Sequence, residues 1–118
     1  MAVCVFEEIL GKVLVDVCVD NTIDEVKFTC DDGAEYVLKH YQDCCEDVHI
    51  ESIVGDIQDL VGHPILMAER VESDDNSEEF ESATWTFLKF ATVKGYVDIR
   101  FHGSSNGYYG ESADMYKL

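Results

Sequence analysis

Residues 83–102 alternate between two sets of side chains at every second position, and this pattern most constrains what the chain can fold into. Successive side chains of a β-strand point to opposite faces, so a period of two indicates a strand. Residues 83–93 and 96–102 follow this period and are rich in the aromatic and β-branched residues typical of strands. Lys94-Gly95 between them is a tight-turn sequence. We therefore predict a β-hairpin that runs from Trp85 to His102.

The same period recurs elsewhere in the chain. Four further segments predict strands: residues 12–20, 25–30, 34–41 and 65–71. In the first of them, the alternation places four valines on one face: Val13, Val15, Val17 and Val19. Asp31-Asp32-Gly33 predicts a hairpin turn between the second and third, because glycine readily adopts the positive φ of tight turns.

Two segments favour short helices. The apolar side chains of residues 5–10 share a helical face and Gly11 follows as a stop signal, while Ile53, Ile57 and Leu60 give residues 50–60 a helical pattern. Three polar or terminal segments complete the prediction: an acidic loop over 72–82, a short strand at 108–109 and a tail that frays over 110–118. The sequence thus predicts a single α+β domain over residues 1–118, mainly antiparallel β-sheet with one or two short helices.

The charge balance excludes several classes of partner. The chain holds 25 Asp and Glu against 8 Lys and Arg, which gives a net charge of −17. A field of this sign repels nucleic acid and anionic membranes, and it attracts cations or basic protein surfaces. No apolar run approaches the roughly 18 residues of a membrane span. We expect a protein partner with a basic surface, no direct nucleic-acid binding and no membrane association.

The chain carries no recognisable catalytic signature. It contains neither a phosphate loop nor a dinucleotide fingerprint, and no helix is predicted after the Gly-Ser-Ser-Asn-Gly run at 103–107 that would make it a nucleophile elbow. Carboxylates beside Cys44 and Cys45 disfavour a thiolate nucleophile. We therefore predict that the protein is not an enzyme, has no catalytic residue and needs no cofactor.

Residues 40–51 concentrate the remaining candidate ligands, two histidines and two adjacent cysteines among four carboxylates. Adjacent residues of a strand point to opposite faces, so Cys44 and Cys45 do not suit one tetrahedral zinc ion. A transition-metal site that combines His40, one of these cysteines and His102 remains an alternative. The interpretation we favour is structural and without a metal. The other cysteines, Cys4, Cys18 and Cys30, are expected to be buried free thiols in a reducing cytoplasm.

Several motifs carry a family resemblance. They are the run from His40 to Asp56 with Gln42-Asp43-Cys44-Cys45-Glu46, then Gly62-x-Pro64-Ile65-Leu66-x-Ala68-Glu69, Thr84-Trp85-Thr86-Phe87 and Gly103-x-Ser105-Asn106-Gly107-Tyr108-Tyr109. The chain resembles, over nearly its whole length, a family of small uncharacterised proteins met mostly in bacteriophages and prophages, a domain of unknown function. The resemblance implies a viral origin. It also suggests one ligand site in which residues 103–109 lie beside residues 40–46, with these candidates: His40, Cys44, Cys45, Asn106 and Tyr108.

Together, the acidity and the resemblance predict a small phage-type protein that binds and inhibits a host protein in the host cytoplasm. Anti-CRISPR or anti-restriction activity by nucleic-acid mimicry fits the size and charge. The predicted partner-binding residues are eight carboxylates: Asp43, Glu46, Asp47, Glu51, Asp74, Asp75, Glu78 and Glu79. The alternative is a metal- or small-ligand-binding domain that uses the His40/Cys44/Cys45 region. The protein is expected to be a monomer or a homodimer that pairs through a hairpin edge.

Overall fold

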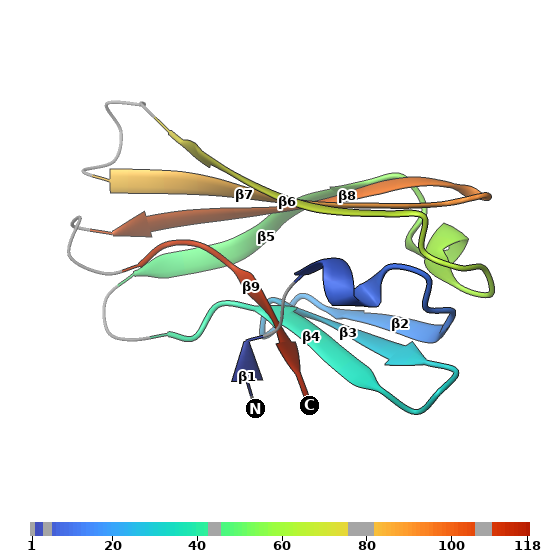
Figure 1. Cartoon of the computed structure of the whole chain (residues 1–118). Coiled ribbons are helices and arrows are strands. Elements are labelled where there is room, and N and C mark those ends of the chain that lie inside the picture. Colours follow the sequence, from blue (N-terminus) through green and yellow to red (C-terminus); the bar gives the residue numbers. More distant parts are fainter. Residues whose placement is uncertain (1, 4–5, 43–45, 76–81, 106–109) are drawn as a thin grey trace.

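The computed structural model describes residues 2–3, 6–42, 46–75, 82–105 and 110–118, and in these residues the chain forms two facing layers of β-sheet (Figure 1). The elements in chain order are β1 (Ala2–Val3), η1 (Phe6–Ile9), β2 (Leu14–Asp20), β3 (Glu25–Cys30), β4 (Glu35–Lys39), β5 (Asp47–Val54), η2 (Ile57–Leu60), β6 (Met67–Asp74), β7 (Ser82–Thr92), β8 (Gly95–Ser105) and β9 (Asp114–Lys117).

The two sheets have different sizes and a simple pairing pattern. The larger has five strands in the order β1-β9-β4-β3-β2, and the smaller has four in the order β5-β8-β7-β6. All strand pairs within both sheets are antiparallel. The last strand, β9, returns from the region of the smaller sheet to sit between β1 and β4. The architecture is therefore a two-layer sandwich of antiparallel sheets.

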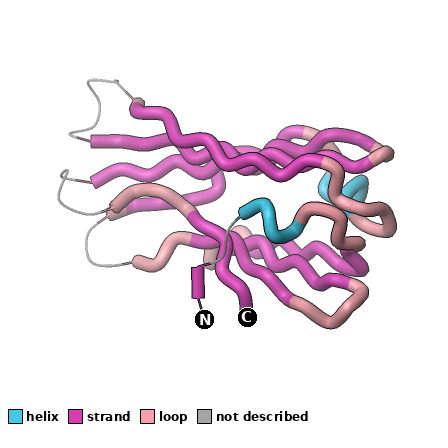
Figure 2. The backbone as a smooth tube through the Cα atoms, viewed as in Figure 1, coloured by secondary structure: helices cyan, strands magenta, loops and turns pink. Residues whose placement is uncertain are grey.

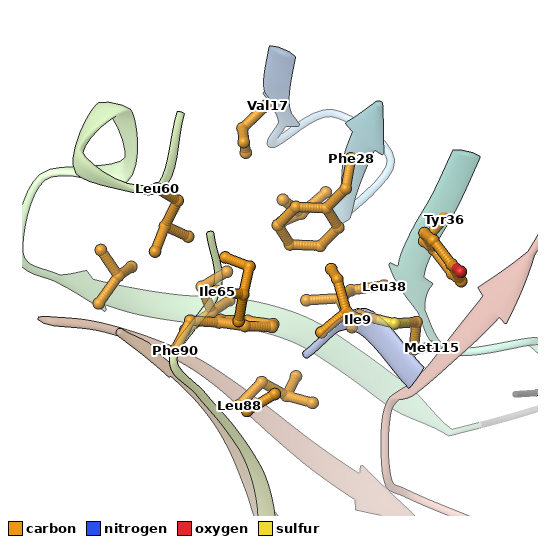
Figure 3. Close-up of a cluster of buried hydrophobic side chains, with 14 of the residues drawn as sticks. Ile9, Val17, Phe28, Tyr36, Leu38, Leu60, Ile65, Leu88, Phe90 and Met115 are labelled. Carbon is orange, nitrogen blue, oxygen red and sulfur yellow. The ribbon is translucent and has the colours of Figure 1, made fainter. Parts of the chain in front are cut away.

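The apolar core fills the space between the layers (Figure 3). Phe28 of β3 and Phe90 of β7 meet across it with ring centroids 5.3 Å apart, and Phe6 of η1 contacts Phe90 at 5.1 Å. Leu88, Phe90, Val97 and Ile99 have no exposed surface. Burial of each such side chain contributes roughly 1.5–3 kcal/mol to the stability of the fold. The apolar contact between the two layers therefore holds the sheets together.

The strongest prediction from the sequence is confirmed. β7 and β8 form a hairpin that turns between Thr92 and Gly95, and their register places Trp85 opposite His102. β3 and β4 also form the predicted hairpin, with Gly33 at a φ of 88° in the turn. The strand predicted over 65–71 forms as β6, which begins at Met67 and continues to Asp74.

The α+β class fits only loosely, because the helices in the described part of the chain are two four-residue 3-10 turns (Figure 2). The first of them, η1, lies within the short helix predicted over residues 5–10. Residues 50–54 belong to strand β5 rather than to a helix. A β-bulge between Ile50 and Ser52 adds one residue to β5, so Ile50 and Ile53 both face the core although they are three residues apart. The predicted helical pattern came from Ile53, Ile57 and Leu60, which the structure divides between strand β5 and the 3-10 turn η2.

The predicted buried face of β2 is partly wrong, because this strand also contains a bulge. The register shifts between Leu14 and Asp16, so the buried residues are Leu14 and Val17, while Val15 is 54% exposed. The shift also turns Cys18 outward, and it is an exposed free thiol, whereas Cys30 is buried as predicted. Cys4 lies outside the described residues.

The predicted fraying of residues 110–118 is wrong. Residues 114–117 form β9, which pairs with both β1 and β4, and the side chain of Met115 is buried in the core. The strand predicted at 108–109 lies outside the described residues, as does most of the loop predicted over 72–82. Within the described part of the chain, no helix is long and apolar enough to cross a membrane.

One side chain joins the two sheets at their edges. Asp24, in the turn between β2 and β3, accepts a hydrogen bond from the backbone N–H of Ile50 at 3.0 Å through its Oδ1 atom. Ile50 stands at the bulge of β5, so its N–H is satisfied by the other sheet's turn. The backbone of Asp24 has a φ of 53°, which aspartate tolerates better than most residues.

We expect Gly103→Ala to destabilise the protein by about 3 kcal/mol and to lower Tm by about 10 °C, because a Cβ atom there would lie 2.0 Å from the carbonyl oxygen of Glu111. Gly110→Ala is the matched control, since its Cβ would meet no atom within 4 Å. Thermal unfolding of both variants measures the difference. Equal Tm values would show that residues 110–113 are not packed against β8.

Candidate functional site

The interior of the sandwich becomes polar at one end. On the inner face of β7 and β8, Leu88 and Phe101 give way to hydroxyl side chains toward that end. Residues 110–113 cross over these hydroxyls before the chain enters β9, and Gly103 allows their close approach.

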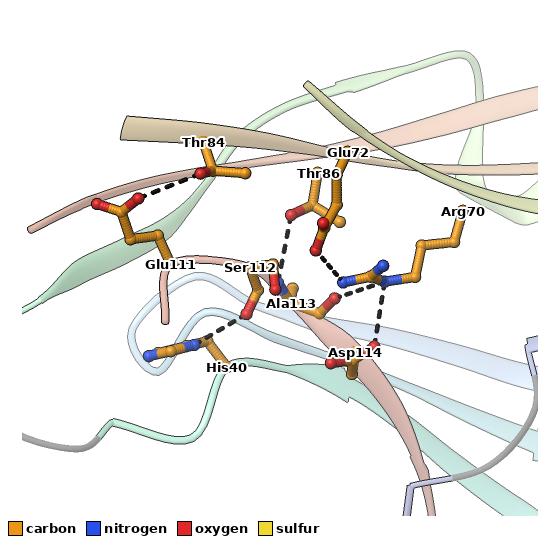
Figure 4. A network of polar contacts seen from close by, with 9 residues as sticks. All are labelled: His40, Arg70, Glu72, Thr84, Thr86, Glu111, Ser112, Ala113 and Asp114. Carbon is orange, nitrogen blue, oxygen red and sulfur yellow. Dashed lines mark hydrogen bonds and ion pairs between the residues drawn. The ribbon is translucent and has the colours of Figure 1, made fainter. Parts of the chain in front are cut away.

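Glu111 is the centre of this polar end (Figure 4). Its buried carboxylate accepts hydrogen bonds from three hydroxyls: Ser82 at 2.9 Å, Thr84 at 3.1 Å and Ser105 at 2.8 Å. The backbone N–H of Ala113 donates to the hydroxyl of Thr86 at 3.3 Å. These bonds satisfy a buried acid without a cation, so we interpret Glu111 as a structural residue.

Arg70 of β6 ties the same segment to the edge of the smaller sheet. Its Nε donates to the carbonyl oxygen of Ala113 at 3.0 Å and pairs with Asp114 at 3.1 Å, and its Nη2 pairs with Glu72 at 2.6 Å. Hydrogen bonds from Arg70 and from Ser112 hold the pKa of Glu72 below its usual value. Burial raises the pKa of Asp114 despite the nearby guanidinium.

The structure places His40, a predicted ligand residue, against this segment. Its Nδ1 lies 2.9 Å from the carbonyl oxygen of Ser112, and its Nε2 lies 2.9 Å from Oε2 of Glu46. Both ring nitrogens therefore have protein partners. The side chain of Glu46 has no exposed surface and pairs with His40 inside the protein, a position that does not suit its predicted role in partner binding.

The other residues of the predicted ligand site lie outside the described residues: Cys44, Cys45, Asn106 and Tyr108. Described residues that flank them are neighbours, since Asp47 pairs with Ser104 across β5 and β8 and His40 contacts Ser112. The hypothesis that residues 40–46 and 103–109 lie side by side is compatible with these contacts. In the part of the chain that the structure describes, no three His, Cys, Asp or Glu side chains are grouped to hold a metal ion.

The predicted acidic surface is divided by the fold. Asp47, Glu51 and Asp75 gather on the outer face of the smaller sheet around two histidines. Asp74 is exposed but belongs to the opposite face of β6, because neighbouring side chains of a strand alternate. The remaining predicted carboxylates lie outside the described residues: Asp43, Glu78 and Glu79.

The outer face of the smaller sheet holds a shallow pocket of about 250 Å³ that the sequence alone did not predict. Five side chains line it: His49, Glu51, Asp75, Trp85 and His102. The register brings them together, because His102 of β8 lies opposite both Trp85 of β7 and His49 of β5.

The two histidines connect the acids of this pocket. His102 Nε2 lies 3.0 Å from Oδ2 of Asp75, and His49 Nε2 lies 2.8 Å from Oε2 of Glu51. The centroids of the two imidazole rings are 5.9 Å apart, and the rings of Trp85 and His102 form a T-shaped pair with centroids 4.6 Å apart. The pocket thus combines an aromatic wall with carboxylates from β5 and from the end of β6.

The aromatic wall continues beyond the pocket. Trp85 and Phe87 lie nearly parallel, with centroids 6.0 Å apart and an interplanar angle of 4°. The guanidinium of Arg100 lies over the Phe87 ring at 5.6 Å, and the ammonium of Lys89 lies over it at 6.0 Å. This face therefore already holds cations against aromatic rings within the chain itself.

Comparison with models of protein families identifies the family of this chain. Residues 7–115 match DUF7448, a domain of unknown function. The chain belongs to the DUF7448 family. The resemblance to a domain of unknown function is therefore confirmed over most of the chain. Among curated proteins and solved structures, none matches this DUF7448 chain.

We expect two substitutions beside Arg70 to change the stability of the DUF7448 domain in opposite directions. The lowered pKa of Glu72 means that its charge stabilises the fold above its usual pKa, so Glu72→Gln should lower the free energy of unfolding near neutral pH. The raised pKa of Asp114 means that its charge costs stability there, so Asp114→Asn should raise it. Both side chains are partly exposed, so each change should stay below about 1 kcal/mol.

Urea unfolding at steps from about pH 7 to about pH 3 measures both effects. The gain in unfolding free energy of Asp114→Asn should disappear as the pH falls from the pKa of Asp114 in the folded protein to its pKa in the unfolded chain. The loss of unfolding free energy in Glu72→Gln should disappear only at lower pH, below the pKa of Glu72 in the folded protein. A loss of similar size in both variants at neutral pH would contradict this assignment of the two carboxylates.

Proposed function

We propose that this protein is a non-enzymatic binding protein whose acidic surface occupies a basic surface of another protein and blocks it. The observation that carries the proposal is the convergence of Asp47, Glu51 and Asp75 on one exposed sheet face. This convergence occurs in a chain with a net charge of −17. Such a field attracts basic surfaces and speeds their encounter with the protein.

The mechanism is competition with nucleic acid. Duplex DNA presents about one negative charge per 1.7 Å of its axis, and proteins that bind it line their grooves with Lys and Arg. A protein face that carries carboxylates and aromatic rings can occupy such a groove through charge and shape without being nucleic acid. The bound groove then excludes its normal ligand.

The biological setting that fits best is a bacteriophage protein that acts in the host cytoplasm. The support is the sequence resemblance to phage and prophage proteins, together with small size and high acidity. The target class we propose is a nucleic-acid-binding defence complex of the host, such as a CRISPR or restriction complex.

A metal- or small-ligand-binding domain is the second candidate function. The contacts of His40 with Ser112 and of Asp47 with Ser104 bring the flanks of the candidate ligand site together. His40 itself is engaged at both ring nitrogens, which leaves it less suited to bind a ligand. Elemental analysis of protein purified without chelator separates the two functions, since bound metal would favour the second.

We expect the immobilised protein to retain nucleic-acid-binding proteins from a bacterial lysate at low salt, and to release them at high salt or with duplex DNA. The double variant Asp47→Asn/Glu51→Gln should weaken retention by up to about tenfold, because it removes two charges from the binding face. Quantitative mass spectrometry of the retained proteins measures the change.

The matched control is Asp16→Asn/Asp31→Asn, which removes two exposed charges from the five-stranded sheet and its β3–β4 turn. Equal retention by the two double variants would point to net charge alone rather than to the proposed face. The proposal would be contradicted if retention did not change with salt concentration. It would also be contradicted if no nucleic-acid-binding protein were retained.

A further inference from the structure

The pocket on the outer face of the smaller sheet combines an aromatic wall with carboxylates, a combination that suits an organic cation. Its aromatic wall is Trp85, and its polar groups include the carboxylates of Glu51 and Asp75. A cation over an indole ring is attracted by the ring's negative face, and indole is the best aromatic partner for this contact. The pocket opens on the same face as Asp47, which adds negative charge beside it.

We propose that this pocket binds one arginine side chain of the basic partner, with the guanidinium stacked on Trp85 and hydrogen-bonded to Glu51 and Asp75. This inference rests on the proposed function and names the contact that anchors it. The occupant follows from charge complementarity, because a partly exposed aromatic ring edged by carboxylates matches a group that is both planar and positive.

The structure favours a guanidinium over an ammonium for two reasons. A guanidinium is planar and weakly hydrated, so it stacks on an aromatic face and still donates to carboxylates in its plane. The same sheet face shows this combination in Arg100, which lies 5.6 Å from the centre of the Phe87 ring and pairs with Asp98 at 3.0 Å, whereas the ammonium of Lys89 lies farther from the same ring, at 6.0 Å. The pocket repeats that aromatic and carboxylate environment one cross-strand row away, at Trp85 and His102.

The histidines position the carboxylates for this role. His49 contacts Oε2 of Glu51, and His102 contacts Oδ2 of Asp75, so the acids are held at the pocket rather than extended into solvent. A carboxylate accepts up to about four hydrogen bonds, so a contact with an imidazole does not exhaust it. Glu51 and Asp75 can therefore accept from a guanidinium while they remain bonded to the rings.

The chain contains a built-in probe, because Trp85 is its single tryptophan. We expect acetyl-Gly-Arg-Gly-amide to change the fluorescence of Trp85 saturably. The same tripeptide with citrulline, which has nearly the same shape and no charge, should cause no saturable change. The lysine tripeptide should bind more weakly than the arginine one, since an ammonium does not stack on the indole.

Two substitutions test the carboxylates. Glu51→Gln and Asp75→Asn should each weaken binding of the arginine peptide by about three- to fivefold, as expected for a partly exposed ion pair. Glu69→Gln is the matched control, because Glu69 is an exposed carboxylate of β6 that lies outside the pocket, and its loss should leave the affinity unchanged. Glu51 is exposed, so the test survives if Asp75→Asn disturbs the fold.

The outcomes separate the pocket from the proposed function. Equal affinity for the arginine and citrulline peptides, or equal weakening by Glu69→Gln and Glu51→Gln, would overturn the pocket assignment. If the peptide fails to bind while retention of basic proteins still depends on Asp47 and Glu51, the pocket fails and the proposed function stands. If the peptide binds but no basic protein is retained, the pocket stands and the proposed function fails.

Discussion

The fold depends on burying one face of each sheet against the other, and two β-bulges make that burial complete. They lie in β2 and β5, each of which is one of the two edge strands of its sheet. Each bulge adds one residue, so that side chains three apart both reach the core: Leu14 with Val17 and Ile50 with Ile53. Without the extra residue, the second member of each pair would face solvent. Asp24 then fixes the relative position of the two edges by binding the N–H of Ile50.

The molecule separates structural acids from exposed ones. At the polar end, buried carboxylates have partners within the protein, as Glu111 has in three hydroxyls and Glu46 has in His40. On the outer face of the smaller sheet, Glu51 and Asp75 are held by histidines beside an aromatic wall and remain accessible from solvent. These carboxylates thus occur in two settings, buried with partners inside the protein and accessible beside an aromatic ring, and the proposed function uses the accessible ones.

Local sequence patterns predicted the hairpins, but they predicted few of the long-range contacts between them. The alternation on both sides of the turn predicts the hairpin but not its register. A turn at Lys94-Gly95 would pair Trp85 with Ser104, whereas the turn lies at residues 93–94 and Trp85 pairs with His102. The approach of His49 to that pair comes from the long-range pairing of β5 with β8, which no local pattern encodes. The bulge in β2 misled the prediction of its buried face, because a single inserted residue changes a period of two into a spacing of three. In β5 the predicted helix rested on Ile53, Ile57 and Leu60, which the structure divides between β5 and η2.

The edge strands of the two sheets also determine whether a strand of another molecule can pair with this protein. A strand that joins a sheet edge needs a regular row of free backbone donors and acceptors, and a bulge interrupts that row. β2 and β5 are interrupted in this way, and the third edge, β6, carries the carboxylates Glu69, Glu72 and Asp74. Lateral growth of the sheets by addition of further strands is thus discouraged at each of these three edges. Other molecules can then contact the broad face of a sheet. Contacts there are made by side chains, which substitutions can change without disturbing the backbone.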